Sequence, residues 1–235
     1  MIRAREDVSK NTIARMVIYY NTLEKMKEEG ERICASTRLG QRTGIASPLI
    51  RRDLACFGGF GRKGVGYEVD FLLSWIKEIL GYNTEWKVLF VGTGIALKGI
   101  ANSYGFLPPG FKIVAVADWD KNNHGYKIPE LNVRIQPLES LTTLIKEQDI
   151  SIGLVNVHPK QAQKVVNILV KARIRGIANF SPISVFVPKH ILLSQMNVSS
   201  CLSQLSYNLS GGNIPGRQNL VNYLPHGQGK NQIQG

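Results

Sequence analysis

The sequence is short of cysteine, of long apolar runs and of acidic residues, and the first two shortages exclude whole classes of protein. Its three cysteines, Cys34, Cys56 and Cys201, form neither a CxxC nor a CxxH spacing, so we expect no disulfide framework and no zinc site. Apolar runs such as 88–91 are too short to span a membrane, and charges near the first residue exclude a secretory leader. We therefore expect a cytoplasmic protein that uses neither a membrane nor a metal.

The shortage of acidic residues points to a partner. The chain has 29 Lys and Arg against 17 Asp and Glu, which gives a formal net charge of +12. A surplus of this size favours a polyanionic partner such as a nucleic acid. The basic residues gather between 32 and 63, where Asp53 is the only acid. Hydrophobic residues make up 43% of the 235 residues, which is enough for one or two folded cores.

Two short helices with a glycine between them are expected within residues 1–81. Ser36 and Ser47 are the predicted N-caps, Pro48 suits the first helical position, and Gly44 suits the tight turn between the helices. The pair follows a longer amphipathic helix that begins after a serine cap. This order is typical of a helix-turn-helix, whose second helix enters the major groove of DNA.

The basic side chains follow the same pattern. Arg51 and Arg52 lie one turn into the second helix, where the side chains that read bases are found. The segment 57–67 has five glycines and predicts a β-hairpin with Arg62 and Lys63 at its tip. A basic wing beside a recognition helix completes a winged-helix domain. The plain alternative for these residues is a solvated basic surface.

Strands and helices alternate from residue 82 to residue 198, which predicts a Rossmann-like parallel sheet. We expect strands at 87–91, 112–117, 133–136, 150–157 and 176–180, with helices near 139–148 and 160–173. Asp118 ends the second strand and suits the ribose hydroxyls of NAD better than the phosphate of NADP. Glycines after the first strand let the backbone approach a pyrophosphate. The cofactor-binding candidates all follow strands at one predicted edge: Gly92, Thr93, Gly94, Ile95, Ala96, Asp118, Asn156, Val157, Asn179 and Phe180.

A last helix is expected over 199–209, followed by a tail over 210–235 that is rich in Gly, Asn and Gln and is expected to be disordered. Leu202, Leu205 and Leu209 recur in the helix at helical spacing and need an apolar partner.

Four groups of residues resemble the Rex family of bacterial redox-sensing transcriptional repressors, and the likeness runs from Val8 to Leu209. The groups are Ser47 with 50–54, the glycine-rich segment 57–67, the opening at Gly92, and Asn179-Phe180-Ser181-Pro182. The resemblance implies a homodimer that is not an enzyme. It implies NADH and NAD as the sensed cofactors and an A/T-rich inverted repeat of double-stranded DNA as the partner, released by NADH. It also implies that the helix 199–209 swaps onto the partner subunit. The DNA-binding candidates are Ser47, Arg51, Arg52, Phe60, Arg62 and Lys63.

Several positions depart from the family pattern, most of them in the nucleotide-sensing half. Leu97 stands in place of the third glycine of the fingerprint, Ser103 in place of a tyrosine, and Cys201 and Ser203 in place of Glu and Gln. Leu97 must either displace its helix or fill a nearby space. The changes leave open a Rex-like DNA-binding regulator whose nucleotide site is lost or retuned. An oxidoreductase is the alternative from another class, but the sequence has no evident Tyr-xxx-Lys or His-Asp pair and little room for a substrate domain.

Overall fold

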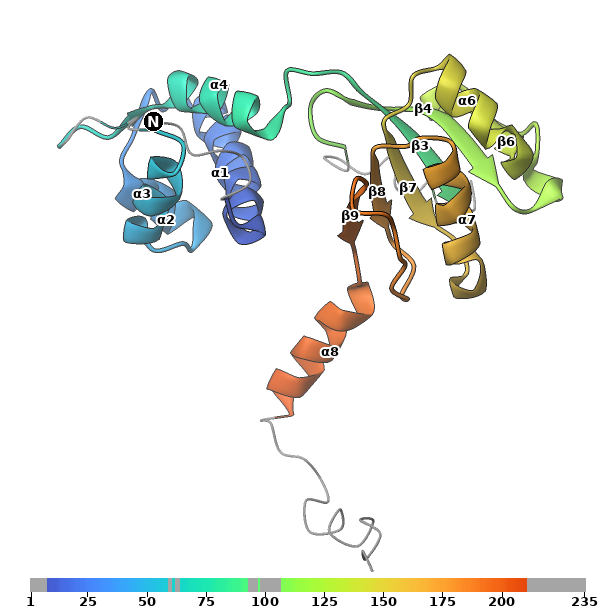
Figure 1. Cartoon of the computed structure of the whole chain (residues 1–235). Helices are drawn as coiled ribbons and strands as arrows, with labels where there is room; N and C mark the ends of the chain where they lie inside the picture. Colours follow the sequence, from blue (N-terminus) through green and yellow to red (C-terminus); the bar gives the residue numbers. More distant parts are fainter. Residues whose placement is uncertain (1–7, 59–60, 62–63, 93–96, 98–106, 211–235) are drawn as a thin grey trace, which may run out of the picture.

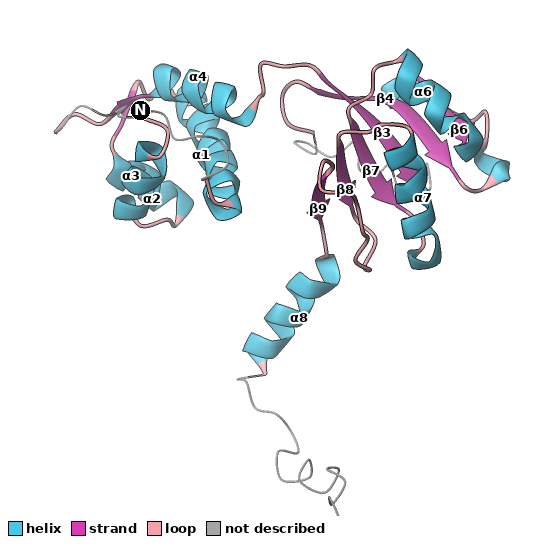
Figure 2. Ribbon diagram, viewed as in Figure 1, coloured by secondary structure: helices cyan, strands magenta, loops and turns pink. Residues whose placement is uncertain are grey.

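The computed structural model describes residues 8–58, 61, 64–92, 97 and 107–210. Figure 1 shows a helical N-terminal domain, an open sheet flanked by helices, and a last helix that projects away from both. Figure 2 shows the same view by secondary structure, with the strands confined almost entirely to the C-terminal domain. The expected division into a helix-turn-helix part and an α/β part is therefore confirmed.

Four helices and a two-stranded antiparallel sheet make up the N-terminal domain. The first helix begins where the Ser9 hydroxyl accepts the backbone N–H of Thr12 at 3.1 Å, as the sequence predicts. Buried side chains from all four helices, among them Met16, Leu39 and Ile50, form one core. The elements are α1 (Lys10–Glu28), β1 (Ile33–Cys34), α2 (Ser36–Thr43), α3 (Ser47–Ala55), β2 (Tyr67–Glu68) and α4 (Val69–Leu80).

The helix-turn-helix is confirmed, but its serine caps are not. Gly44 ends α2 in the left-handed conformation at φ 71°, and α3 follows after three residues. Neither helix has a side-chain cap: Ala35 and Ala46 hold the cap positions, so Ser36 and Ser47 are the first helical residues. Pro48 is accordingly second in α3. The two hydroxyls bind an arginine instead, as described below.

The structure describes only part of the predicted wing, chiefly its C-terminal end. Phe60, Arg62 and Lys63 lie outside the described residues, so the hairpin tip remains a prediction. The described strand β2 pairs antiparallel with β1, thirty-odd positions earlier in the chain, with Ile33 opposite Glu68 and Cys34 opposite Tyr67. This pairing ties the end of the wing segment to the chain just before α2.

The C-terminal sheet has the strand order β5-β6-β4-β3-β7-β8-β9. All neighbouring strands are parallel except β5, which pairs antiparallel with β6. The chain runs outward from β3 through β4 to β6 and then returns to β7, so the order reverses between β3 and β7, the point where open α/β sheets bind ligands. The strands are β3 (Trp86–Gly92), β4 (Phe111–Asp118), β5 (Lys127–Ile128), β6 (Val133–Pro137), β7 (Ile152–Asn156), β8 (Gly176–Asn179) and β9 (Leu192–Gln195).

The two faces of this sheet carry separate apolar cores. One face is covered by α6 (Leu141–Glu147) and α7 (Pro159–Lys171), whose buried residues pack with Leu89, Val91 and Val155. The other face holds Phe90, Val116 and Leu97. Leu97 is completely buried there, so it fills a space in the core, one of the two outcomes expected of a leucine at this position.

Aromatic rings join the two domains. The Tyr20 ring of α1 meets Tyr82 edge-on with centroids 5.2 Å apart, and Tyr82 meets Phe111 at 6.4 Å. Phe111 stacks on Trp86 at 6.2 Å and packs against the N-terminal core as well as the second sheet core. The Trp86 indole N–H donates to the Gly81 carbonyl at 2.9 Å. We call these four rings the aromatic joint.

None of the residues that the structure describes covers the last helix, α8 (Val198–Leu209). Asn197 caps it by accepting the N–H of Ser200 at 3.0 Å, and every residue of the helix is exposed. Leu202 and Leu205 are about three-fifths exposed and Leu209 is 87% exposed. The tail over 211–235 lies outside the described residues.

Candidate nucleic-acid interface and nucleotide site

Arg51 lies where the first turns of α2 and α3 meet. Its Nη1 donates to the Ser36 hydroxyl at 3.0 Å and to the Ser47 hydroxyl at 3.3 Å. Arg51 and Arg52 are both exposed. The sequence predicted Ser47 and the two arginines for this surface but assigned Ser36 only a capping role. The two helices thus converge on one exposed guanidinium, a group that binds guanine edges and phosphates.

Two other basic residues of the 32–63 stretch are neutralised. Arg42 pairs with Glu29 and Glu31, with Nη1 to Glu29 at 2.8 Å and Nη2 to Glu31 at 2.7 Å, and Arg38 pairs with Glu31 at 2.9 Å. Hydrogen bonds from Arg42 lower the pKa of Glu29, and those from Arg38 lower the pKa of Glu31. Glu29 and Glu31 lie just before residue 32, so the count of charges within 32–63 alone overestimated the positive charge of this region. Within the described part of this stretch, the exposed Arg51 and Arg52 of α3 therefore carry most of the remaining positive charge.

The cofactor candidates that the structure describes lie at the carboxyl edge of the sheet. Gly92 at the end of β3 is directly opposite Asn156 at the end of β7, and Asn179 ends β8 beside Val155. Asp118 ends β4 on the other side of β3. Val157 and Phe180 follow Asn156 and Asn179 directly. Thr93, Gly94, Ile95, Ala96 and Ser103 lie outside the described residues.

Gly92 is in the closest contact at this edge. A Cβ at this position would overlap the Asn156 carbonyl oxygen and lie 2.9 Å from its carbonyl carbon. Both atoms belong to the backbone of a central strand and cannot move aside cheaply. Only glycine therefore lets β3 and β7 stay together where the order of strands reverses.

We expect Gly92→Ala to separate the ends of β3 and β7 and to cost about 1–3 kcal/mol of unfolding free energy. Nucleotide binding falls further than stability, because the displaced residues are those at the ligand edge. Thermal unfolding and calorimetry with NADH measure the two effects. Gly176→Ala is the matched control, since a Cβ there meets its nearest atoms at 3.8 Å or more. Equal losses in both variants would contradict the assignment of Gly92.

Asp118 is held rigidly at the end of β4. It is 2% exposed, and its carboxylate accepts the Asp120 N–H at 3.1 Å and the Asn123 amide at 2.7 Å. Its backbone carbonyl lies 3.0 Å from Nε2 of His124. These hydrogen bonds fix the orientation of the Asp118 carboxylate at the end of the strand. The sequence predicted Asp118 but not the turn residues that hold it.

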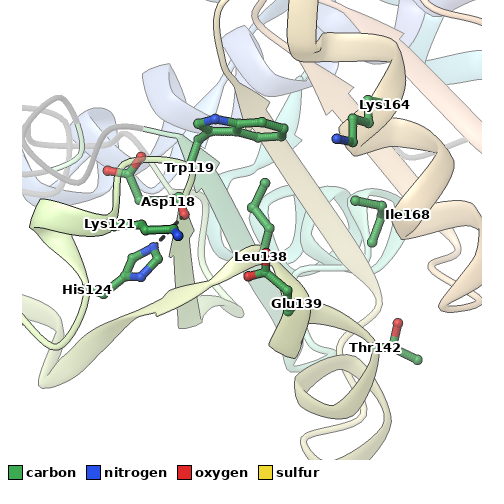
Figure 3. Close-up of a pocket in the computed structure, with 9 residues that line it drawn as sticks. All are labelled: Asp118, Trp119, Lys121, His124, Leu138, Glu139, Thr142, Lys164 and Ile168. Carbon is green, nitrogen blue, oxygen red and sulfur yellow. Dashed lines mark hydrogen bonds between the residues drawn. The ribbon is translucent and has the colours of Figure 1, made fainter.

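A cavity of about 360 Å³ adjoins Asp118, a size in the range of small-molecule sites. Trp119, Leu138 and Ile168 supply apolar walls, and Lys164 Nζ lies 4.7 Å from the centroid of the Trp119 ring. Figure 3 shows the indole at one side of the cavity, with Leu138 beneath it and the Lys164 side chain directed towards it. The cavity thus combines a flat apolar wall with the buried Asp118 carboxylate at its edge.

Asn179 holds the loop after β8. Its amide donates to the Ile183 carbonyl and to Oε1 of Gln195, both at 2.9 Å, and its Oδ1 accepts the Ser181 N–H at 3.1 Å. The side chain is completely buried, so in this conformation it shapes the loop. Phe180, which is partly buried, is anchored by its N–H to the Val155 carbonyl at 2.8 Å. The sequence did not predict β9 and therefore missed Gln195.

The described residues contain neither a metal-binding cluster nor a membrane-spanning helix. No group of three or more His, Cys, Asp or Glu side chains there is placed to hold a metal ion. No helix in the same part of the chain is both long and apolar enough to cross a membrane.

Comparison with known proteins covers both domains. Residues 7–55 match the family model described as "Putative DNA-binding protein N-terminus", and residues 83–183 match the CoA binding domain. The redox-sensing transcriptional repressor Rex of Syntrophobacter fumaroxidans is 35% identical over 201 residues, covering 86% of this chain and 95% of that protein. The Rex repressor of Pelotomaculum thermopropionicum is 36% identical over 202 residues, covering 86% and 94%. This chain belongs to the Rex family.

Solved structures agree with this membership. The crystal structure of the Rex-family repressor RSP with β-NAD+ and operator DNA matches with a TM-score of 0.81 at 31% identity, covering 87% of this chain and 94% of that one. The RSP complex with β-NADH matches with a TM-score of 0.77 at 30% identity, covering 88% and 96%. Rex proteins are transcriptional repressors rather than enzymes, so the oxidoreductase alternative is set aside.

Proposed function

We propose that this Rex-family chain is a homodimeric repressor that binds operator DNA through its winged helices and releases it when NADH occupies the Rossmann-like domains. The observation that carries the proposal is the match to the RSP complex with β-NAD+ and operator DNA, which extends through both domains. Both sites described above belong to this one chain. In this proposal residues 1–81 are the winged-helix domain, 82–198 the Rossmann-like domain, 199–209 the swapped helix and 210–235 the tail. The protein acts in the cytoplasm.

In the DNA-binding half, α3 enters the major groove. Arg51 and Arg52 face base edges there, while the Ser47 hydroxyl, now paired with Arg51, steadies the guanidinium or contacts a phosphate. The basic wing residues Arg62 and Lys63, with Phe60 beside them, contact phosphates or the minor groove.

In the nucleotide half, the two ends of the ligand have different tasks. The pyrophosphate lies over Gly92 and the residues that follow it, Thr93, Gly94, Ile95 and Ala96. Asp118 binds the adenosine ribose, and the cavity at Trp119 takes the adenine. The nicotinamide end lies near the loops at Asn156, Val157, Asn179 and Phe180, where NADH and NAD differ in charge and planarity.

The homodimer is supported by α8. Its apolar side chains are exposed along the whole helix, and an apolar stripe at helical spacing needs a covering surface. A second copy supplies that surface when its two domains receive the helix, and two-fold symmetry then matches an inverted repeat.

Titration of NADH into the complex of protein and operator tests the proposal. A ligand loosens DNA binding only by as much as its affinity differs between the DNA-bound and free dimers, so release itself must be measured. We expect micromolar NADH to release the DNA and the same concentration of NAD to leave it bound. A complex that persists at millimolar NADH would instead identify a nucleotide-blind repressor, the alternative raised by Leu97, Ser103, Cys201 and Ser203.

A further inference from the structure

An ion pair between a buried carboxylate and a mostly buried guanidinium joins the recognition helix to the first helix of the chain. Asp53 of α3 is 2% exposed, although it directly follows the exposed Arg51 and Arg52. Arg15 of α1 grips its carboxylate with two atoms, Nε to Oδ2 and Nη2 to Oδ1, each at 2.6 Å. Such a fork forms only when the guanidinium and the carboxylate share a plane, so it restricts the orientation of both helices.

Two hydroxyls of α1 complete the network. The Tyr19 hydroxyl donates to Oδ2 of Asp53 at 2.8 Å, and the Thr12 hydroxyl donates to Oδ1 at 3.4 Å. Thr12 also accepts from Arg15 at 3.3 Å, which couples the donors to each other. Thr12, Arg15 and Tyr19 are three and four positions apart and therefore share one face of α1.

The charges of this network are costly to bury, so stability is a weak reason for their presence. Burial raises the pKa of Asp53, but the hydrogen bonds from Arg15 and Tyr19 outweigh it and lower the pKa, so Asp53 is charged. Well-packed apolar residues in place of a buried ion pair often give equal or greater stability. What an ion pair adds over apolar packing is a defined direction.

The direction fixed by this ion pair affects how α3 meets DNA. Successive helical residues turn by about 100°, so Asp53 points about 200° away from Arg51 around the helix axis. Fixing the inward carboxylate therefore fixes the outward aim of the arginines. We propose that Arg15 and Asp53 are positioning residues for operator recognition, with Tyr19 as their support: they set the rotation of α3 and hence which bases Arg51 and Arg52 meet. This rests on the proposed role of α3 in DNA binding.

The test compares specific with non-specific binding by the full-length protein. The wild-type protein first enriches its inverted repeat from a randomised DNA pool, and an unrelated duplex of equal length serves as the non-specific probe. In Asp53→Asn we expect operator affinity to fall at least about tenfold while affinity for the unrelated duplex changes less than about twofold. Asp70→Asn, which breaks the exposed pair of Asp70 with Lys27, is the matched control and leaves both affinities unchanged.

A second variant distinguishes an effect on the orientation of α3 from an effect on the stability of the fold. In the double variant Arg15→Met with Asp53→Leu, apolar side chains replace the ion pair. We expect this variant to keep the melting temperature of the wild type but to lose its affinity for the operator. Tyr19→Phe keeps the pair and removes one hydrogen bond, so it loses operator affinity by about twofold to fivefold. The proposal is overturned if the double variant binds operator like the wild type, or if Asp53→Asn lowers both affinities equally. A wild-type protein that enriches no inverted repeat would reject the proposed function itself.

Discussion

Arg51→Ala weakens binding to the inverted repeat by about 1–3 kcal/mol per half-site, the range for one lost bidentate contact to a base. Specificity falls with affinity, because the unrelated duplex never used that contact. The loss also frees the Ser36 and Ser47 hydroxyls, which now accept from Arg51. Gel shifts on operator and unrelated DNA over a salt series measure the change.

Arg38→Ala is the control for this prediction. Its side chain is also a guanidinium on the helix-turn-helix, but it pairs with Glu31 at 2.9 Å. We expect operator affinity to stay within about 0.5 kcal/mol of the wild type, as for an ordinary surface substitution. If Arg51→Ala bound operator as well as Arg38→Ala does, DNA recognition would have to be moved away from the first turn of α3.

We expect removal of the chain after Asn197 to abolish the proposed dimer and, with it, operator binding. The truncation deletes α8 with its exposed leucines, and a monomer contacts only one half-site. Sedimentation shows the change of mass, and gel shifts show the loss of operator affinity. A chain that ends at Ser210 keeps α8 and controls for removal of the tail, so it remains a dimer. A dimer that survived loss of α8 would contradict the swapped helix.

Local patterns predicted most of the fold. The expected strands at 87–91 and 112–117 lie within β3 and β4, because buried parallel strands have nearly continuous apolar runs. The expected strand at 133–136 lies within β6, where apolar and polar residues alternate. The short strands β5 and β9 were missed. Leu192 is 78% exposed and β9 has no buried residue, so it lacks the apolar pattern from which a strand is predicted.

The candidate sites were predictable in position but less so in their contacts. Asp118 and Gly92 follow directly from strand ends, whereas the partners of Arg51 and Asp53 lie 15 and 38 positions away in the sequence. Only the fold brings such residues together. The sequence did hold one signal for the pair of Arg15 and Asp53. Asp53 is the single acid within the basic stretch 32–63, and a carboxylate among basic residues tends to be paired with a cation.

The aromatic joint restricts rotation of the N-terminal domain, and of α3 within it, relative to the C-terminal sheet of the same chain. The ring centroids are 5.2–6.4 Å apart, and Phe111 packs against a core of each domain, so the rings restrain the orientation of the two domains. A symmetric repressor needs its two recognition helices about 34 Å apart, one turn of the double helix. That spacing then depends on the angle between the subunits, and a few degrees of rotation at the dimer axis would take both helices out of register with the operator while each subunit keeps its shape.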